Sequence, residues 1–171
     1  MLYIQGPTES LAAKPRTAGL CETKPVGIQA KLMKAHWTED SAYKAVASWL
    51  RLATSQDAVI DLVGAQDDSM AAGARKAFHD HTTGAARERW LKLPFTGCDG
   101  LPKTGQAWVH SKLLTATIIV PPNAGQAMEM LVHALRGGPM PRERSLTVPN
   151  SYPPIEFLAA TQKDKSHALG I

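Results

Sequence analysis

The chain has 171 residues, enough for one domain with a substantial core. Its 44% hydrophobic and 20% charged residues are typical of a globular protein and exclude a disordered one. The formal net charge is +4, but the basic residues form no stripe with interleaved aromatics, so we expect no nucleic-acid role. No run approaches the roughly 20 apolar residues of a membrane span. Residues 1–7 also lack the basic and apolar regions of a secretory signal.

Strand and helix patterns alternate from the first residues onward. Residues 2–5 are predicted to form a short apolar strand. The helix that follows either is capped by Thr8 or begins near Lys14-Pro15, and it ends at Lys24-Pro25. Apolar and polar residues alternate over residues 26–33, which predicts a strand with one solvated side or an edge strand. Thr38 is predicted to cap the next helix, which buries a stripe at helical spacing: Ala42, Val46, Trp49, Leu50 and Ala53.

The second half continues this alternation. Residues 59–65 are predicted to form the third strand and residues 70–78 the helix after it, in which Gly73 indicates a close contact with the sheet. The next predicted elements are a short helix or turn over 85–91 and strands over 93–98 and 113–120, which flank a helix over 105–109. A helix between Asn123 and Gly137 and an extended edge segment within 145–159 complete the chain's predicted elements. This order predicts a three-layer α/β fold, in which helices cover both faces of a mostly parallel open sheet.

The junction Gln66-Asp67-Asp68 is the most informative stretch of the sequence. It lies between the third strand and its helix, and ligands of open α/β sheets bind at the carboxyl ends of strands. A helix N-terminus also carries positive partial charge, which favours an acid there. We expect one aspartate to be the N-cap and the other to be a candidate ligand residue.

Signals for cofactors, metals and catalysis are weak. The first strand is not followed by a Gly-x-Gly-x-x-Gly or phosphate-loop motif, so we expect no nucleotide cofactor. His79 and His81 are two residues apart near a helix end and point in different directions, which favours polar surface over a metal site. Cys21 and Cys98 are not expected to form a disulfide. We find no nucleophile with a partnered base, so we expect no catalytic residue and no enzyme.

Four motifs, in order, resemble one protein family. Residues 65–74 resemble the AQND-MA-GA signature of type I periplasmic sugar-binding proteins, the solute receptors of ABC sugar importers, whose fold is shared by effector domains of lactose-repressor-type regulators. Residues 97–100 resemble the family's G-[FVC]-DG turn, residues 11–20 its AARERGxGF helix start, and residues 114–118 its LxATI strand.

The resemblance implies that this chain is a single lobe. Such receptors have two similar α/β lobes around a cleft, and every matching motif belongs to the C-terminal lobe. We therefore expect one sugar-binding lobe over residues 1–160, a polar tail over 161–171, and a parent with an N-terminal lobe and an ABC permease as partner. The parent is expected in the periplasm or outside the cell. The cleft face, without its second lobe, is predicted to self-associate.

The resemblance also implies half of a sugar site. Asp99 matches an acid that accepts sugar hydroxyls, and Trp37 matches an aromatic that packs on the sugar ring. Asp67 matches an asparagine of the family, and Lys14 matches a ligand-binding arginine, although lysine lacks the bidentate fork.

Three further residues are expected to have structural or secondary roles. Arg16 matches a second, structural arginine, while Gln66 and Asp68 flank Asp67, and Asp68 is expected to be the cap or a structural residue. Ligand contact is thus expected from Lys14, Trp37, Asp67 and Asp99, which belong to four segments that meet at one sheet edge.

The leading interpretation is the sugar-binding lobe of an ABC-importer receptor, which recognises hydroxyls without chemistry. The first alternative is the effector-binding and dimerisation lobe of a lactose-repressor-type regulator. The second is a receiver- or phosphatase-like domain, because paired acids at a strand end are typical of such pockets; against it, the acids follow the third strand rather than the first.

Overall fold

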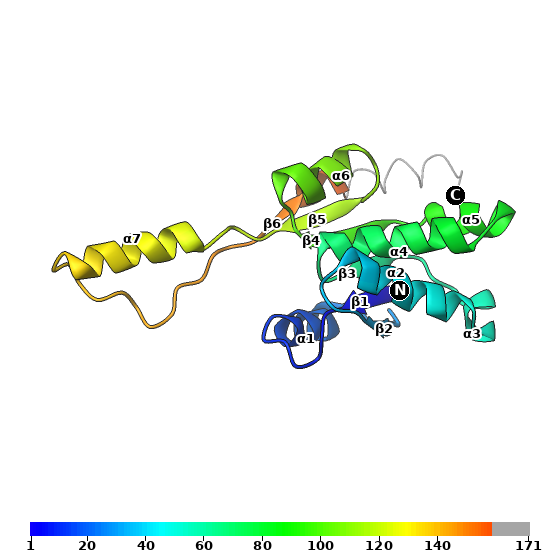
Figure 1. Ribbon diagram of the computed structural model, residues 1–171, viewed down its shortest axis with the longest axis horizontal. Helices are drawn as coiled ribbons and strands as arrows, with labels where there is room; N and C mark the ends of the chain where they lie inside the picture. The colour runs from blue at the N-terminus through cyan, green and yellow to red at the C-terminus, as the bar shows by residue number, and fades with distance from the viewer. Residues whose placement is uncertain (159–171) are drawn as a thin grey trace.

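A six-stranded sheet organises the protein, and its strand order is β2-β1-β3-β4-β5-β6 (Figure 1). The structure is a computed structural model that describes residues 1–158, so the predicted tail over 161–171 lies outside the described residues. Strands β1 to β5 are parallel, and β6 runs antiparallel to β5. The strands are β1 (Leu2–Gln5), β2 (Lys31–Lys34), β3 (Val63–Ala65), β4 (Phe95–Asp99), β5 (Ala116–Ile119) and β6 (Asn150–Tyr152).

Helices lie on both faces of the sheet, which confirms the predicted fold class. They are α1 (Ala13–Thr23), α2 (Glu39–Leu50), α3 (Ala53–Gln56), α4 (Asp68–His81), α5 (Gly84–Leu91), the π-helical turn η1 (Pro102–Gln106), α6 (Ala107–His110) and α7 (Ala124–Leu135). The core lies between the sheet and the helices α2, α4 and α5, where Leu2, Ile4 and Val63 meet Phe78 and Trp90. We call this side of the sheet the core face.

Helix α1 lies on the opposite face. Side chains alternate between the two faces along a strand, so Tyr3 points away from the side of Leu2 and Ile4. Its hydroxyl donates to the carbonyl oxygen of Arg16 in α1 over 3.5 Å. One face therefore carries the main core, and the other is covered by α1 near β1.

Element boundaries differ from the sequence-based expectation where apolar residues continue beyond the hydrogen-bonded ladder. Val26 and Val59 belonged to predicted strands but lie in loops, where Val59 is 84% exposed. Thr8 does not cap α1; the hydroxyl of Ser10 accepts instead from the backbone N–H groups of Ala12 and Ala13. Pro15 lies in the first turn of α1, where its missing N–H costs nothing.

Gly73 permits a contact between two helices, and not with the sheet as predicted. A Cβ at Gly73 would overlap the backbone carbonyl of Glu39 in the first turn of α2. The backbones of α2 and α4 therefore approach as closely as their atoms allow, and both helices contribute to the same core.

Helix α7 leaves the body of the protein. It continues from the carboxyl end of β5, and residues 136–149 run back from it to β6 (Figure 1). The sequence predicts an apolar side made of Ala127, Met130, Leu131 and Leu135, yet no residue of α7 is buried. We call α7 together with residues 136–149 the arm. Among residues 1–158, no helix is long and apolar enough to cross a membrane.

The substitution Gly73→Ala tests the contact between α2 and α4. Alanine favours helix, yet its methyl group would press on the Glu39 backbone, so we expect the free energy of unfolding to fall by about 1–3 kcal/mol. Gly19→Ala in α1 is the matched control, because a Cβ there meets no atom within 4 Å. It should raise stability by about 0.5–1 kcal/mol. Urea unfolding measures both, and equal effects of the two substitutions would contradict the contact.

Candidate functional site

The carboxyl ends of three neighbouring strands bring the candidate residues together. Strands β1, β3 and β4 lie side by side and parallel, so Gly6, Gln66 and Asp99 leave the sheet at the same edge. Ligands of open α/β sheets bind at this edge. The site is therefore built from loops that the sheet holds in register.

A buried amide ties these loops to each other. The side-chain oxygen of Gln66, which is 1% exposed, accepts from the backbone N–H of Gly6 over 2.9 Å. Its side-chain nitrogen donates to the carbonyl of Ala13 over 3.2 Å and to the hydroxyl of Thr17 over 2.8 Å. Gln66 thus fixes the first turns of α1 against the end of β3, and Arg16 lies between its two partners in α1.

Arg16 is the centre of the candidate site. One guanidinium nitrogen donates to the backbone carbonyl of Gln66, and Nη2 pairs with Oδ1 of Asp99 over 3.1 Å. Its Cζ also lies 5.5 Å from the ring centroid of Trp37, within reach of a cation–π interaction. The planar fork of arginine suits this triple role. Sequence analysis assigned Arg16 a secondary role, whereas the structure joins three of the other predicted residues through it.

Trp37 is held in a strained backbone conformation. Its φ is 61°, in the left-handed region that costs a bulky residue roughly 1–2 kcal/mol. A Cβ at Gly6 would overlap the indole, so the glycine allows the ring to lie directly on the backbone at the end of β1. Asp99 also has a positive φ of 96°. Two strained residues at one sheet edge indicate a functional surface.

Asp67 is the N-cap of α4. Its Oδ1 accepts from the backbone N–H of Met70 over 2.6 Å. No described residue donates to its Oδ2, and that atom is not fully buried. Burial raises the pKa of Asp67, partly offset by the hydrogen bond from Met70. One oxygen therefore serves the helix and the other is available to a ligand.

Asp68 is buried and has a structural role, one of the two roles expected for it; the other expected role, capping the helix, is wrong, because Asp67 is the N-cap. Its Oδ2 accepts from the backbone N–H of Gly100 over 2.8 Å, and its Oδ1 from the hydroxyl of Thr117 over 2.5 Å. A Cβ at Gly97 or Gly105 would overlap this carboxylate. Burial raises the pKa of Asp68. Because both of its oxygens are engaged, Asp68 is not free to hold a phosphate or cation beside Asp67.

Lys14 lies apart from this cluster. Its side chain is exposed, and within residues 1–158 it forms no ion pair. It borders a hollow of about 320 Å³ with Gln5, Gly6 and Thr8. The structure therefore connects Arg16 with Gln66, Trp37 and Asp99, and leaves Lys14 at the margin.

The remaining reactive side chains have local partners. His79 Nδ1 contacts Asp80 over 2.8 Å, and His81 Nε2 contacts the hydroxyl of Tyr43 over 3.0 Å. Among the described residues, no three His, Cys, Asp or Glu side chains gather as a metal site. Cys21 and Cys98 are free thiols, as predicted.

Sequence reasoning missed the residues that support the site from a distance. Gly6, Thr17 and Thr117 were not singled out. Thr117 follows Asp68 by 49 residues, and Gln66 follows Thr17 by 49 residues as well. A buried amide or carboxylate must find partners, but the sequence does not say which ones.

Replacing Asp68 tests its role as a tie. Asp68→Ala leaves two donors without a partner, which we expect to lower the free energy of unfolding by about 2–4 kcal/mol. Asp68→Asn should cost much less, because its amide can accept from Gly100 and donate to the Thr117 hydroxyl. Chemical denaturation at pH 7 measures both. Equal losses in the two variants would contradict a hydrogen-bonded tie.

The raised pKa of Asp68 also predicts how the free energy of unfolding depends on pH. The folded-state pKa of Asp68 is raised above its unfolded value near 3.8, so the folded state binds the proton more tightly. The stability that this carboxyl contributes is therefore fully present below the unfolded pKa and is lost as pH rises through the folded pKa. The stability of Asp68→Asn minus that of wild type should increase from about pH 3 to pH 7. A constant difference would contradict a burial-raised pKa.

Comparison with solved structures shows that the chain has a known fold. Neither a family model nor a curated protein matches the sequence. The fructose-binding periplasmic domain of a hybrid two-component system matches with a TM-score of 0.70 at 24% identity, over 96% of this chain and 55% of that one. An ABC transporter periplasmic solute-binding protein from Actinobacillus succinogenes with bound D-allose matches with a TM-score of 0.68 at 20% identity, over 88% of this chain and 51% of that one.

Regulators are among the similar structures too. A LacI family transcriptional regulator from Arthrobacter sp. FB24 in complex with lactose matches with a TM-score of 0.59 at 24% identity, over 86% of this chain and 54% of that one. This chain spans about half the length of the solved structures that it matches. Its structural neighbours are type I periplasmic sugar-binding proteins and LacI-family regulators, and the chain has the fold of one lobe of a periplasmic binding protein.

Proposed function

We propose that this chain is a carbohydrate-binding lobe that recognises sugar hydroxyls without chemistry. The observation that supports this most is the cluster around Arg16, which joins Asp99, Trp37 and the end of β3 at the carboxyl edge of the sheet. Sugars present hydroxyls around a ring and C–H groups on its faces. A flat aromatic beside fixed polar groups suits such a ligand.

Each residue of the cluster has a distinct part in this proposal. Asp99 keeps a half-exposed carboxylate, of which only Oδ1 is paired, and its other oxygen can accept from a hydroxyl. Asp67 offers its Oδ2 in the same way, although it has no donor to give. Arg16 supplies donors and holds Trp37 in place for the C–H face of the ring.

The finer proposal is the ligand-binding lobe of an ABC-importer solute receptor. The resemblance of residues 65–74 and 97–100 to that family's motifs supports it, as does the match to the D-allose-bound receptor. The parent would then work in the periplasm or outside the cell with a permease. The regulator alternative is favoured by the match to the lactose-bound LacI family protein. Export of the parent protein into the periplasm would decide for the receptor.

A sugar titration tests the proposal. One lobe supplies only half of the contacts that enclose a ligand, so we expect dissociation constants around 1 mM or weaker. Amide and indole chemical shifts in nuclear magnetic resonance spectra, recorded with a panel of pentoses, hexoses and inositols, measure this. Shifts should concentrate at Trp37, Asp67 and Asp99. The absence of any saturable shift, or shifts confined to another surface, would contradict the proposal.

Asp67→Ser separates recognition from capping. Serine caps a helix about as well as aspartate, so the fold should persist, but its hydroxyl is too short to meet the same ligand atom. We expect binding to weaken roughly tenfold or more, the effect of one lost hydrogen bond to a charged group. Asp61→Ser is the matched control, because Asp61 is exposed before β3, at the opposite end of that strand. Equal binding by both variants would remove Asp67 from the site.

A further inference from the structure

Asp67 is a buried carboxylate that has no cationic partner among the described residues. It is 6% exposed, and within residues 1–158 no arginine, lysine or histidine forms an ion pair with it. Its one hydrogen bond there comes from the backbone N–H of Met70 and goes to Oδ1. Burying an ionised carboxylate costs free energy unless a countercharge or hydrogen bonds compensate for the lost water. The open Oδ2 of Asp67 is therefore a place for a positively charged donor.

Asp99 brings a second open carboxylate oxygen to the same place. The parallel register pairs Gly64 with Thr96. Asp67 and Asp99 each lie three residues further along, so they leave the sheet at the same level, from strands about 4.8 Å apart. Burial is the main cause of the raised pKa of Asp67, and the negative charge of Asp99 adds to it, as expected of neighbouring carboxylates. Asp99 pairs with Arg16 through Oδ1 and leaves its Oδ2 free of the ion pair.

Negative charge exceeds positive charge at this edge of the sheet. The three carboxylates of Asp67, Asp68 and Asp99 interact here with a single guanidinium, that of Arg16. The other nearby cation, Lys14, is exposed and forms no ion pair within residues 1–158. The whole chain has a formal net charge of +4, so the local excess of acid does not follow from the composition.

The hydrogen-bonding groups at this edge leave more acceptors than donors for a ligand. Both ends of the Gln66 amide are used within the protein. The groups left open are Oδ2 of Asp67, Oδ2 of Asp99, the ring of Trp37 and the remaining N–H groups of Arg16. An ammonium carries three donors and no acceptor, so it can donate to two carboxylates at once. An aromatic face also attracts cations.

We propose that the ligand of this edge is an amino sugar, whose protonated amine donates to Oδ2 of Asp67 and Oδ2 of Asp99 while its ring packs on Trp37. This inference rests on the sugar-binding function proposed above and names the substrate class. The ammonium supplies the countercharge that Asp67 lacks. Its hydrogen bonds to carboxylates are charge-assisted on both sides, whereas those of a neutral hydroxyl are not. A uronic acid would instead add to the excess of negative charge.

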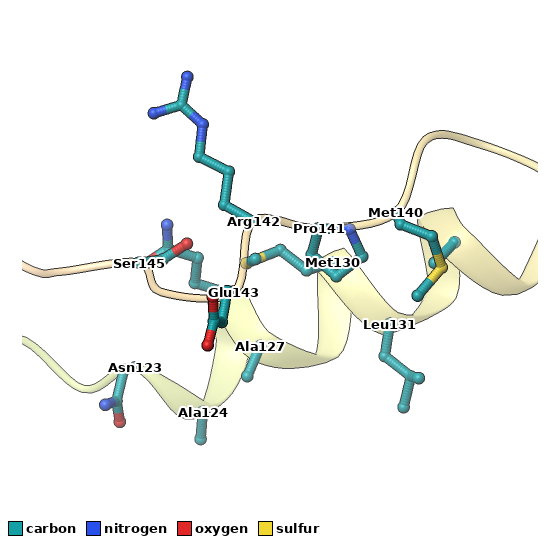
Figure 2. A pocket seen from close by; sticks show the side chains of 12 residues that line it. Asn123, Ala124, Ala127, Met130, Leu131, Met140, Pro141, Arg142, Glu143 and Ser145 are labelled. Atoms are coloured by element: carbon teal, nitrogen blue, oxygen red, sulfur yellow. The ribbon is translucent and has the colours of Figure 1, made fainter.

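Acidic residues beside other hollows do not share this feature. Figure 2 shows Glu143 beside a hollow of about 470 Å³ on the arm, with Arg142 next to it in the chain. Asp61 borders another hollow, of about 550 Å³, at the opposite end of β3 from Asp67. Both of these acids are exposed, so water solvates their charge. Asp67 differs from them in its burial, which makes the missing countercharge costly.

Matched pairs of sugars test the substrate class. Glucose and galactose are titrated beside derivatives that carry an amine at carbon 2, 3 or 6, at about pH 6, where such amines are protonated. Amide and indole chemical shifts report binding. At least one amino sugar should bind roughly tenfold more tightly than its parent, and glucuronate should bind more weakly than glucose. If the parents bind and no amino sugar binds more tightly, this inference is wrong and the sugar-binding function stands. If no sugar binds, both are wrong.

Asp67→Asn tests whether the preference originates at this carboxylate. Asparagine caps a helix about as well as aspartate, so the substitution removes the charge and keeps the cap. The ratio of amino-sugar affinity to parent affinity should fall from roughly tenfold to about one. Asp67→Ser also removes the charge and keeps a cap, and it should lower the ratio in the same way.

Asp61→Asn is the matched control, because it removes the same charge from an exposed position at the other end of β3. It should leave the ratio of affinities at its wild-type value. Circular dichroism checks that the three variants keep the fold. An unchanged ratio in both Asp67 variants, or an equal fall in Asp61→Asn, would overturn the proposal.

Discussion

The buried amide of Gln66 is the interaction on which the candidate site depends. Its hydrogen bonds to Gly6, Ala13 and Thr17 fix the end of β1 and the first turns of α1 against the end of β3. This arrangement places Arg16 where it can reach Asp99 and Trp37 together. Because the amide is fully enclosed, losing any one bond would leave a polar group unpaired in a dry environment. The candidate site is thus held in shape by hydrogen bonds within the protein itself.

The sequence predicts the layers of the fold better than the details of the site. Apolar periodicity and turn residues indicate the correct order of strands and helices, since each element is specified by its own residues. Asp67 and Asp68 show where this fails. Either acid fits the cap position locally, and the choice is made by Gly100 and Thr117, which hold Asp68 from other strands. The central position of Arg16 was also hidden, because it arises from contacts across the sheet.

Helix α7 shows a second limit of sequence reasoning. Its apolar side is evident from residue spacing, and the predicted fold has helices that cover both faces of the sheet, yet this helix lies on an arm with no buried residue. Periodicity identifies an apolar surface but not the surface that meets it.

The central claim is that the Arg16-centred cluster receives a sugar whose ring packs on Trp37. Intermolecular nuclear Overhauser effects between sugar C–H protons and assigned indole protons test this most directly. Our account predicts contacts to Trp37 for any sugar that shifts the Asp67 and Asp99 amides, and their loss in Arg16→Lys, which cannot keep both ties of the guanidinium. Contacts to other aromatic residues alone, or unchanged contacts in Arg16→Lys, would contradict it.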